Sequence, residues 1–197
     1  MPVPKSYKRE DVLDRAIELF RRQGYSATST AELVETLGMN RKSMYAEFGS
    51  KQELFEAALE RYSEINLTRV LAPIEAPDAN AQSIQEAFFG YASASETKFS
   101  GLGCLMANTA VERAALDPGS AAFVDDYLDR LNRGFTNALK NARQDGDIDA
   151  TANIEDLAAH FVNSVVGISA LLRAKATPEQ MHAASRGATS VLGPARA

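Results

Sequence analysis

The chain is poor in the residues that most often carry metal and thiol chemistry: among its 197 residues there are one cysteine, two histidines and no tryptophan. The single thiol, Cys104, cannot form a disulfide within the chain, and His160 and His182 do not make a cluster with zinc-site spacing. No nucleophile, base and orienting group occur at a recognisable spacing either. We therefore expect no metal, no cofactor and no enzymatic activity.

Long hydrophobic runs are missing as well. No apolar run approaches the roughly 18 to 20 residues that a membrane-spanning helix needs. The first ten residues, MPVPKSYKRE, run into charge rather than into the apolar segment of a signal peptide. A composition of 45% hydrophobic and 24% charged residues is that of an ordinary soluble protein with a sizeable core. We expect a cytoplasmic protein without a membrane partner.

Alternating β-branched runs bounded by turn residues are also absent, and the apolar spacing is helical nearly everywhere. The sequence therefore predicts an all-α fold. One helix is predicted over residues 8 to 23, and the next two begin at the caps Ser29 and Asn40. A fourth begins at Ser50 and is expected to end near Leu71, because a proline follows two residues later.

Further helices are predicted after a connector rich in proline and alanine. Their expected ranges are residues 82 to 97, a segment from the glycines at 101 and 103 to residue 116, residues 118 to 144, residues 153 to 174, and a last helix capped by Thr177.

The last two predicted helices point to a subunit contact. The helix over residues 153 to 174 is apolar on more than one side, and the final helix carries small uncharged residues, which let helices approach closely. We expect a homodimer closed by a four-helix bundle, although two core helices of a monomer remain an alternative. The expected interface residues are Phe161, Val165, Ile168, Leu172, Ala184, Gly187, Ala188 and Val191.

Charge is unevenly distributed. The net charge is -5, yet residues 1 to 51 hold nine Lys and Arg against seven Asp and Glu. Within this part, GMNRKSMYAEFGSK places a glycine-led turn before a short helix whose outward positions carry Arg41, Lys42, Ser43 and Tyr45. This pattern fits a helix-turn-helix. Spacing alone leaves DNA binding and a simple solvated helix face equally open.

A longer stretch resolves that choice. The segment AIELFRRQGYSATSTAELVETLGMNRKSMYAEFGSKQELFEAAL is similar to the N-terminal domain of TetR-family transcriptional regulators over about residues 8 to 60. Its marks include Gly24-Tyr25, Gly38-Met39 and Ser43-Met44-Tyr45. The resemblance implies a dimeric DNA-binding regulator, most often a repressor released from a palindromic operator by a small molecule. It also implies a DNA-binding domain over residues 1–51 and an effector-binding and dimerisation domain over residues 52–197.

Roles in binding double-stranded operator DNA follow residue by residue from the resemblance. Arg41, Lys42 and Ser43 would enter the major groove, where Arg or Lys donates to guanine. The residues expected to bind phosphates, which position the protein without reading sequence, are Thr28, Thr30, Tyr45 and Lys51. Glu47 departs from the usual family residue and puts one DNA contact in doubt.

Polar residues on otherwise apolar helices are candidates for an effector pocket, although each also fits a satisfied core group. The expected lining residues are Phe88, Phe89, Tyr91, Cys104, Asn108, His160, Phe161 and Asn163. The alternative function is a thiol-based sensor of oxidants or electrophiles that acts through Cys104. No Lys, Arg or His adjoins that cysteine in sequence to lower its pKa.

Overall fold

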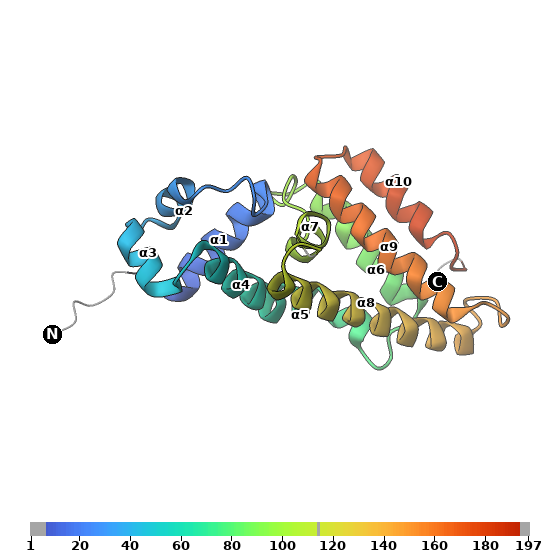
Figure 1. The fold of residues 1–197 in the computed structure, drawn as a ribbon. Coiled ribbons are helices and arrows are strands. Elements are labelled where there is room, and N and C mark those ends of the chain that lie inside the picture. The colour runs from blue at the N-terminus through green and yellow to red at the C-terminus, as the bar shows by residue number, and fades with distance from the viewer. Residues whose placement is uncertain (1–6, 114, 194–197) are drawn as a thin grey trace.

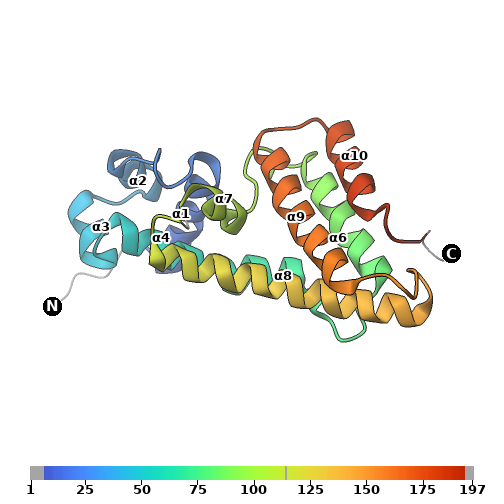
Figure 2. The same cartoon turned by 45° about the vertical axis from the view of Figure 1, so that its right-hand side comes forward.

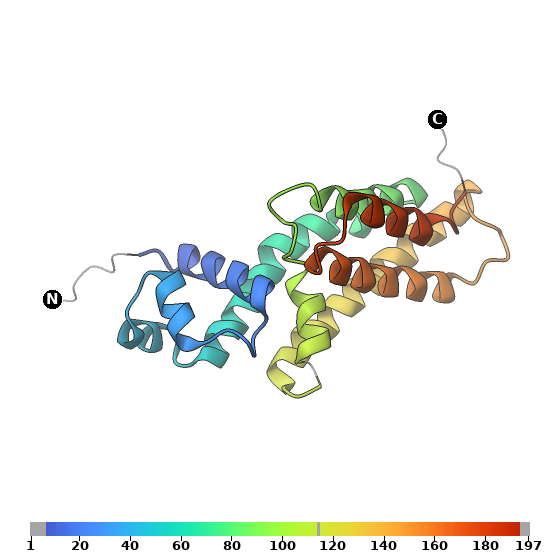
Figure 3. The same ribbon diagram turned by 90° about the horizontal axis from the view of Figure 1, so that it is seen from above.

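The computed structural model describes residues 7–113 and 115–193, and within these residues every regular element is a helix (Figure 1). The all-α prediction is confirmed. The first six residues, on which the signal-peptide expectation partly rests, lie outside the described range, as does residue 114 in the predicted segment after the glycines. Helices α1 to α4 form one end of the molecule, and the α9–α10 pair lies at the other end (Figures 1 and 3).

The N-terminal end is built from α1 (Arg9–Gln23), α2 (Thr30–Leu37), α3 (Arg41–Phe48) and α4 (Lys51–Arg61). The starts of α2, α3 and α4 follow from capping side chains, as the sequence predicts. Ser29 accepts a hydrogen bond from the Glu32 amide at 3.2 Å, and the Glu32 carboxylate accepts one from the Ser29 amide at 2.8 Å. Asn40 caps α3 in the same way, with the Ser43 amide donating at 2.8 Å.

A small core holds these four helices together. Phe20 of α1 meets Phe55 of α4 edge to face, with ring centroids 4.9 Å apart. Met44 and Phe48 anchor α3 from beneath, because both side chains are buried. On the surface, Arg61 of α4 pairs with Asp14 of α1 at 2.7 Å. Burial of Met44 and Phe48 therefore holds the two-turn helix α3, which is too short to be stable alone.

The rod that begins with α4 continues further than the sequence predicts. A π-helical segment, Tyr62–Leu67, follows α4, and α5 (Thr68–Glu75) carries the chain four residues past the expected end at Leu71. Pro73 lies inside α5. A proline inside a helix costs about 3 kcal/mol. Burial of Leu71 and Ile74, as α5 packs against α6 and α8, offsets this cost.

The remaining helices are α6 (Ala81–Ala94), α7 (Leu105–Glu112), α8 (Pro118–Asp145), α9 (Ile154–Arg173) and α10 (Pro178–Thr189). Helix α8 runs from beside α4 to the far end of the molecule and packs against α5, α6 and α9 (Figure 2). At the centre, the rings of Phe88, Phe135 and Phe161 lie 5.3 to 6.3 Å apart. Arg130 pairs with Glu75 at the end of α5, at 2.8 Å.

Helix α9 departs from the expectation about apolar runs. By length and composition alone, its 20 residues are apolar enough to cross a membrane. In the fold, one side of the helix is buried against α6, α8 and α10, whereas the opposite side faces outward. An apolar helix with one buried side is also what a core helix of a soluble protein looks like, so hydropathy carries little weight here.

Candidate DNA interface and ligand pocket

Helix α3 lies at the end of the molecule furthest from α10 (Figure 1), and the burial of its residues shows that its polar side faces outward. Arg41 and Lys42 are exposed, and Ser43 and Tyr45 are partly exposed. Gly38, at φ +65°, adopts the left-handed conformation that lets α2 end and α3 begin three residues later. The turn therefore sets two exposed cations at the start of a short, well-anchored helix.

Tyr45 is held in place by its neighbours. Its hydroxyl lies 3.5 Å from the Thr30 hydroxyl, and the Arg41 guanidinium stands 5.6 Å from the centre of its ring. The hydrogen bond with Thr30, followed by that with Arg41, lowers the pKa of Tyr45 below its ordinary value. Three of the predicted DNA-binding residues thus form one connected surface across α2 and α3.

Thr28 does not belong to that surface. Its side chain is 1% exposed, and its hydroxyl donates a 2.6 Å hydrogen bond to the Gly24 carbonyl. The hydroxyl ties the loop before α2 to the end of α1, so the expected phosphate contact of this side chain is wrong. A buried threonine bonded to its own loop and an exposed one look alike in sequence.

Lys51, the first residue of α4, lies beside the ring of Tyr25. Its ammonium stands 4.2 Å from the centre of the Tyr25 ring, and the Arg113 guanidinium stands 3.8 Å from the same ring. Burial lowers the pKa of Lys51, and the charge of Arg113 lowers it further. A phosphate placed beside the ammonium would offset that penalty. Arg113 is a neighbour of the candidate surface that the sequence did not single out, and Tyr25 stood out only as a mark of the family resemblance.

Glu47 faces away from α3's cations. Its carboxylate accepts a hydrogen bond from the Tyr7 hydroxyl at 3.4 Å and lies 3.6 Å from the Arg9 guanidinium. The departure from the family residue therefore joins α3 to the start of α1, and Arg9 screens its charge.

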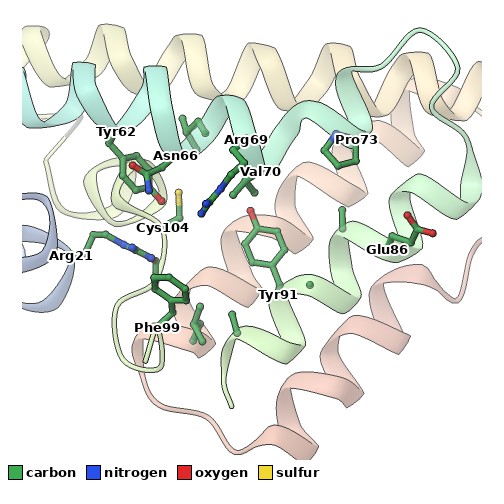
Figure 4. Close-up of a pocket in the computed structure, with 16 residues that line it drawn as sticks. Arg21, Tyr62, Asn66, Arg69, Val70, Pro73, Glu86, Tyr91, Phe99 and Cys104 are labelled. Atoms are coloured by element: carbon green, nitrogen blue, oxygen red, sulfur yellow. The ribbon is translucent and has the colours of Figure 1, made fainter. Parts of the chain in front are cut away.

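Behind the helix-turn-helix, a cavity of about 350 Å³ opens between α5, α6 and the loop before α7 (Figure 4). Its walls are mostly apolar, with a few polar groups, as is usual for a small-molecule site. The lining residues are Arg21, Tyr62, Asn66, Leu67, Arg69, Val70, Pro73, Glu86, Ala87, Gly90, Tyr91, Ala94, Phe99, Gly103, Cys104 and Leu172.

Two of the eight expected pocket residues, Tyr91 and Cys104, line this cavity. The others lie elsewhere, because periodicity does not say which side of a helix faces a hollow. Phe88 and Phe161 are core side chains, and Asn108 is buried at the junction of α1 and α7. Phe89 is 63% exposed and borders a separate hollow beside His182. His160 bonds the Ala188 carbonyl at 2.8 Å, and Asn163 is exposed.

The sequence missed the polar groups that distinguish the pocket. Arg21, Asn66 and Arg69 come from α1, the π-helical segment and α5 respectively. Burial, followed by the nearby Cys104 thiol, raises the pKa of the Tyr62 and Tyr91 hydroxyls. Both phenols therefore stay protonated and are able to donate a hydrogen bond. The signal available in the sequence is helical spacing, which puts Tyr62, eight residues after the buried Leu54, on the buried side of the rod.

The pocket wall is tied directly to the first helix. The Arg21 guanidinium donates to the Gly103 carbonyl, with Nε at 2.8 Å. In return, the Asn108 side-chain amide donates to the Arg21 carbonyl at 3.3 Å and to the Leu102 carbonyl at 3.1 Å. Glu112 accepts hydrogen bonds from the amide groups that follow α1, at 2.7 Å from Ser26. Helix α7 thus clasps the end of α1, which sequence reasoning could not foresee because the partners lie more than 80 residues apart.

Burial also corrects the expected dimer interface. Phe161, Val165, Ile168 and Leu172 are at most 4% exposed within the single chain, and Ala188 is also buried. These side chains face the chain's own core, so their assignment to a subunit contact is wrong. The large apolar side chains of α9 pack into the core of the single chain, and the opposite face of the helix is exposed. Ala184 is partly buried, whereas Gly187 and Val191 are exposed.

Fold and site together define a helix-turn-helix DNA-binding protein with a helical domain that encloses a pocket. Residues 12–58 match the family of bacterial regulatory proteins described as the tetR family, and residues 82–188 match the tetracyclin repressor-like C-terminal domain. The second match covers more than half of the chain, which therefore belongs to the TetR family of DNA-binding transcriptional regulators.

Curated relatives and a solved structure agree with this assignment. The chain is 30% identical to the HTH-type transcriptional repressor ComR of Escherichia coli (strain K12), over 90% of this chain and 85% of that protein. It is 28% identical to the HTH-type regulator YezE of Bacillus subtilis (strain 168), over 90% and 92%. A cysteine mutant of the TetR family regulator CifR, solved with a 26-base-pair operator DNA, superposes with a TM-score of 0.78 at 26% identity, over 95% and 98%.

The matched families are families of transcription regulators, and such regulators are soluble, bind operator DNA as dimers and carry a C-terminal effector-binding domain. These family matches do not favour the alternative function, a thiol-based sensor that acts through Cys104. In this chain Cys104 is 5% exposed and forms part of the pocket wall.

Proposed function

We propose that this protein is a dimeric repressor that binds a palindromic operator and leaves it when a small molecule occupies the pocket. The observation that carries the proposal is the position of Arg21, which belongs to the first helix of the DNA-binding end and also lines the pocket. A ligand in the pocket therefore touches the element whose orientation sets α3. The name of the relative ComR, a repressor, supports the direction of control.

Operator binding is assigned to the exposed surface of α2, α3 and the start of α4. In this assignment Arg41 and Lys42 read base edges, and Thr30, Tyr45 and Lys51 bind phosphates. Ser43, next to the cations, lies within reach of either. Two cations at a helix start oppose the helix dipole, and a phosphate at the same amides turns that cost into a gain. Of the predicted set, only Thr28 is left out.

The subunit contact is assigned to the outward sides of α9 and α10. Several exposed positions there are small or aliphatic, although Asn163 and Arg186 are exposed on the same two helices. The small or aliphatic positions are Ala159, Gly167, Ala170, Leu171, Ala183, Gly187 and Val191. A Cβ added at Gly167 or Gly187 would meet nothing within 4 Å, so both backbones are open to a partner helix. In a two-fold dimer the recognition helices are expected about 34 to 36 Å apart, one turn of DNA.

The domain boundary after residue 51 remains a prediction. Helix α4 packs against α1 on one side and α8 on the other, and Gln52 bonds the Asp117 carboxylate at 2.8 Å. We infer that α4 belongs mechanically to both domains and transmits pocket occupancy to α3. We infer a cytoplasmic location, because the proposed function is binding to operator DNA.

The test is a selection of binding sites from random DNA with the full chain, followed by mobility-shift titration. A palindromic consensus is expected. The double variant Arg41→Ala, Lys42→Ala should lose at least ten-fold in affinity for it, and the control Lys140→Ala, Arg143→Ala, on the far part of α8, should not. Failure to select any consensus, or equal losses in both double variants, would sink the assignment.

A further inference from the structure

We propose that the pocket takes a compact apolar ligand with a single anionic group, and that Arg21 and Arg69 bind this group. The proposal rests on the regulated operator binding proposed above and names the chemical class of its effector. Its basis is the imbalance of charge in the cavity (Figure 4): Arg21 and Arg69 enter from α1 and α5, whereas the one carboxylate of the lining, Glu86, lies at the opposite end.

Neither guanidinium is neutralised by the protein. Across residues 7–113 and 115–193, no carboxylate lies within ion-pair distance of Arg21 or Arg69. Arg21 is partly buried and its acceptor is the neutral Gly103 carbonyl, whereas Arg69 is exposed at the mouth of the cavity. A partly buried cation without a counter-ion favours an anion strongly, and a guanidinium offers paired donors that match a carboxylate or sulfonate.

A third cation, the exposed Lys98, is not a lining residue but lies near Phe99 at this end of the cavity. The Phe99 ring has the Arg21 guanidinium 5.8 Å from its centre and the Lys98 ammonium 5.5 Å from it. Glu86, at the other end, already accepts a hydrogen bond from Gln82 at 2.8 Å. The electrostatic potential in the cavity is therefore positive beside Phe99, and an anion is drawn to that end rather than spread over the site.

The rest of the cavity determines the body of the ligand. Between the two ends the walls carry apolar side chains, among them Leu67, Val70 and Leu172, with the phenol of Tyr91 as a neutral donor. A volume of about 350 Å³ is at the small end of ligand pockets. This shape accommodates one or two fused rings, or a short branched chain, joined to the anionic group.

An anion at this place also acts on α1. It competes with the Gly103 carbonyl for Arg21, and that hydrogen bond helps to hold the end of α1 against the loop before α7. Arg21 therefore has both roles: it binds the anionic group of the ligand, and it passes the effect of binding to α1. A neutral ligand of the same shape would fill the cavity without this competition.

The test compares two fluorescent probes with the same aromatic skeleton: the anionic 1-anilinonaphthalene-8-sulfonate and the neutral N-phenyl-1-naphthylamine. Each is titrated into the wild-type dimer, Arg69→Gln, Arg21→Gln and the surface control Arg143→Gln. In the wild type we expect the anionic probe to bind about ten-fold tighter or better. Each pocket variant should reduce that preference about five-fold or more, with the neutral probe unchanged within about two-fold, and the control should match the wild type.

Equal or tighter binding of the neutral probe by the wild type overturns the proposal, as does a preference that survives in both pocket variants. Operator affinity of the same proteins without probe keeps the two proposals apart. Intact operator binding with no charge preference removes only the ligand class, whereas absence of any selected operator removes the regulatory function itself. At saturating anionic probe, operator release is expected in the wild type and lost in Arg21→Gln; full release by that variant overturns the route through Arg21.

Discussion

The clasp between α1 and α7 makes a quantitative prediction at Asn108. Asn108 is 6% exposed, and its side-chain amide donates to two carbonyls, those of Arg21 at 3.3 Å and Leu102 at 3.1 Å. Replacing it with alanine removes both hydrogen bonds and leaves two acceptors without this donor. At about 1 kcal/mol for each bond, with part of the desolvation penalty added, Asn108→Ala should lower the free energy of unfolding by about 2 to 3 kcal/mol.

The effect is measured by denaturant and thermal unfolding at one fixed protein concentration, because dimer stability depends on concentration. For a chain of this size, 1 kcal/mol corresponds to about 2 to 4 °C, so the melting temperature should fall by about 4 to 12 °C. The denaturant slope should stay constant. Asn108→Leu, which keeps most of the volume without the amide, should be destabilised similarly.

Asn132 is the matched control, since it is the same residue type at an exposed position of α8. Asn132→Ala should change the free energy of unfolding by no more than about 0.5 kcal/mol. If Asn108→Ala and Asn132→Ala shift the melting temperature equally, the two hydrogen bonds contribute nothing net. The clasp would then not be what holds α1 against α7.

Three further predictions concern DNA, assembly and acid stability. Arg41→Ala should weaken specific DNA binding by about 1 to 3 kcal/mol and relax the preference at one base pair. Lys51→Ala should weaken binding to all DNA sequences alike and reduce the slope of log affinity against log salt concentration by about one. If both variants change specific and non-specific affinity equally, the assignment is contradicted. Gly187→Trp should leave the chain folded but yield monomers in sedimentation velocity, because an added Cβ meets nothing within 4 Å in the single chain; an unchanged dimer would move the interface elsewhere. Hydrogen bonds from Ser120 lower the pKa of Asp117 below its ordinary 3.8, so the ionised carboxylate stabilises the fold fully above pH 3.8 and loses this effect as the pH falls through the lower folded pKa. Asp117→Asn should therefore reduce the loss of stability at acid pH. An unchanged loss in that variant would refute this.

Local chemistry explains which parts of the fold were predictable. The starts of α2, α3 and α4 depend on Ser29, Asn40 and Ser50, each of which caps an amide three residues away, so a short window of sequence contains the whole cause. The passage through Pro73 was missed because its compensation comes from packing against α6, which lies beyond the connector, and against α8, which is distant in sequence. Tertiary packing overrides a local helix breaker where enough apolar surface is buried.

The site was predictable to a lesser degree, for the same reason. Arg41 and Lys42 are outward by helical phase alone, and the structure agrees. On α9, the helical phase identified two apolar sides but not which one faces the core; the larger side chains, such as Phe161, went inside. Arg21 was not singled out from the sequence, because its pocket exists only after α7 folds back against it.

The π-helical segment Tyr62–Leu67 sits in the middle of the rod that runs from Lys51 to Glu75, and two of its residues besides Tyr62 line the cavity. From this wide turn to Lys51 the rod is about 16 Å long at 1.5 Å per residue. A rotation of about 5° at the wide turn displaces the Lys51 end by about 1.4 Å, so two chains related by a dyad change their separation by nearly 3 Å. The rise of DNA is about 3.4 Å per base pair. The change in separation of the two DNA-binding ends is therefore close to the rise of one base pair. A rotation no larger than ordinary helix bending would be enough to move one DNA-binding end out of register with its half-site.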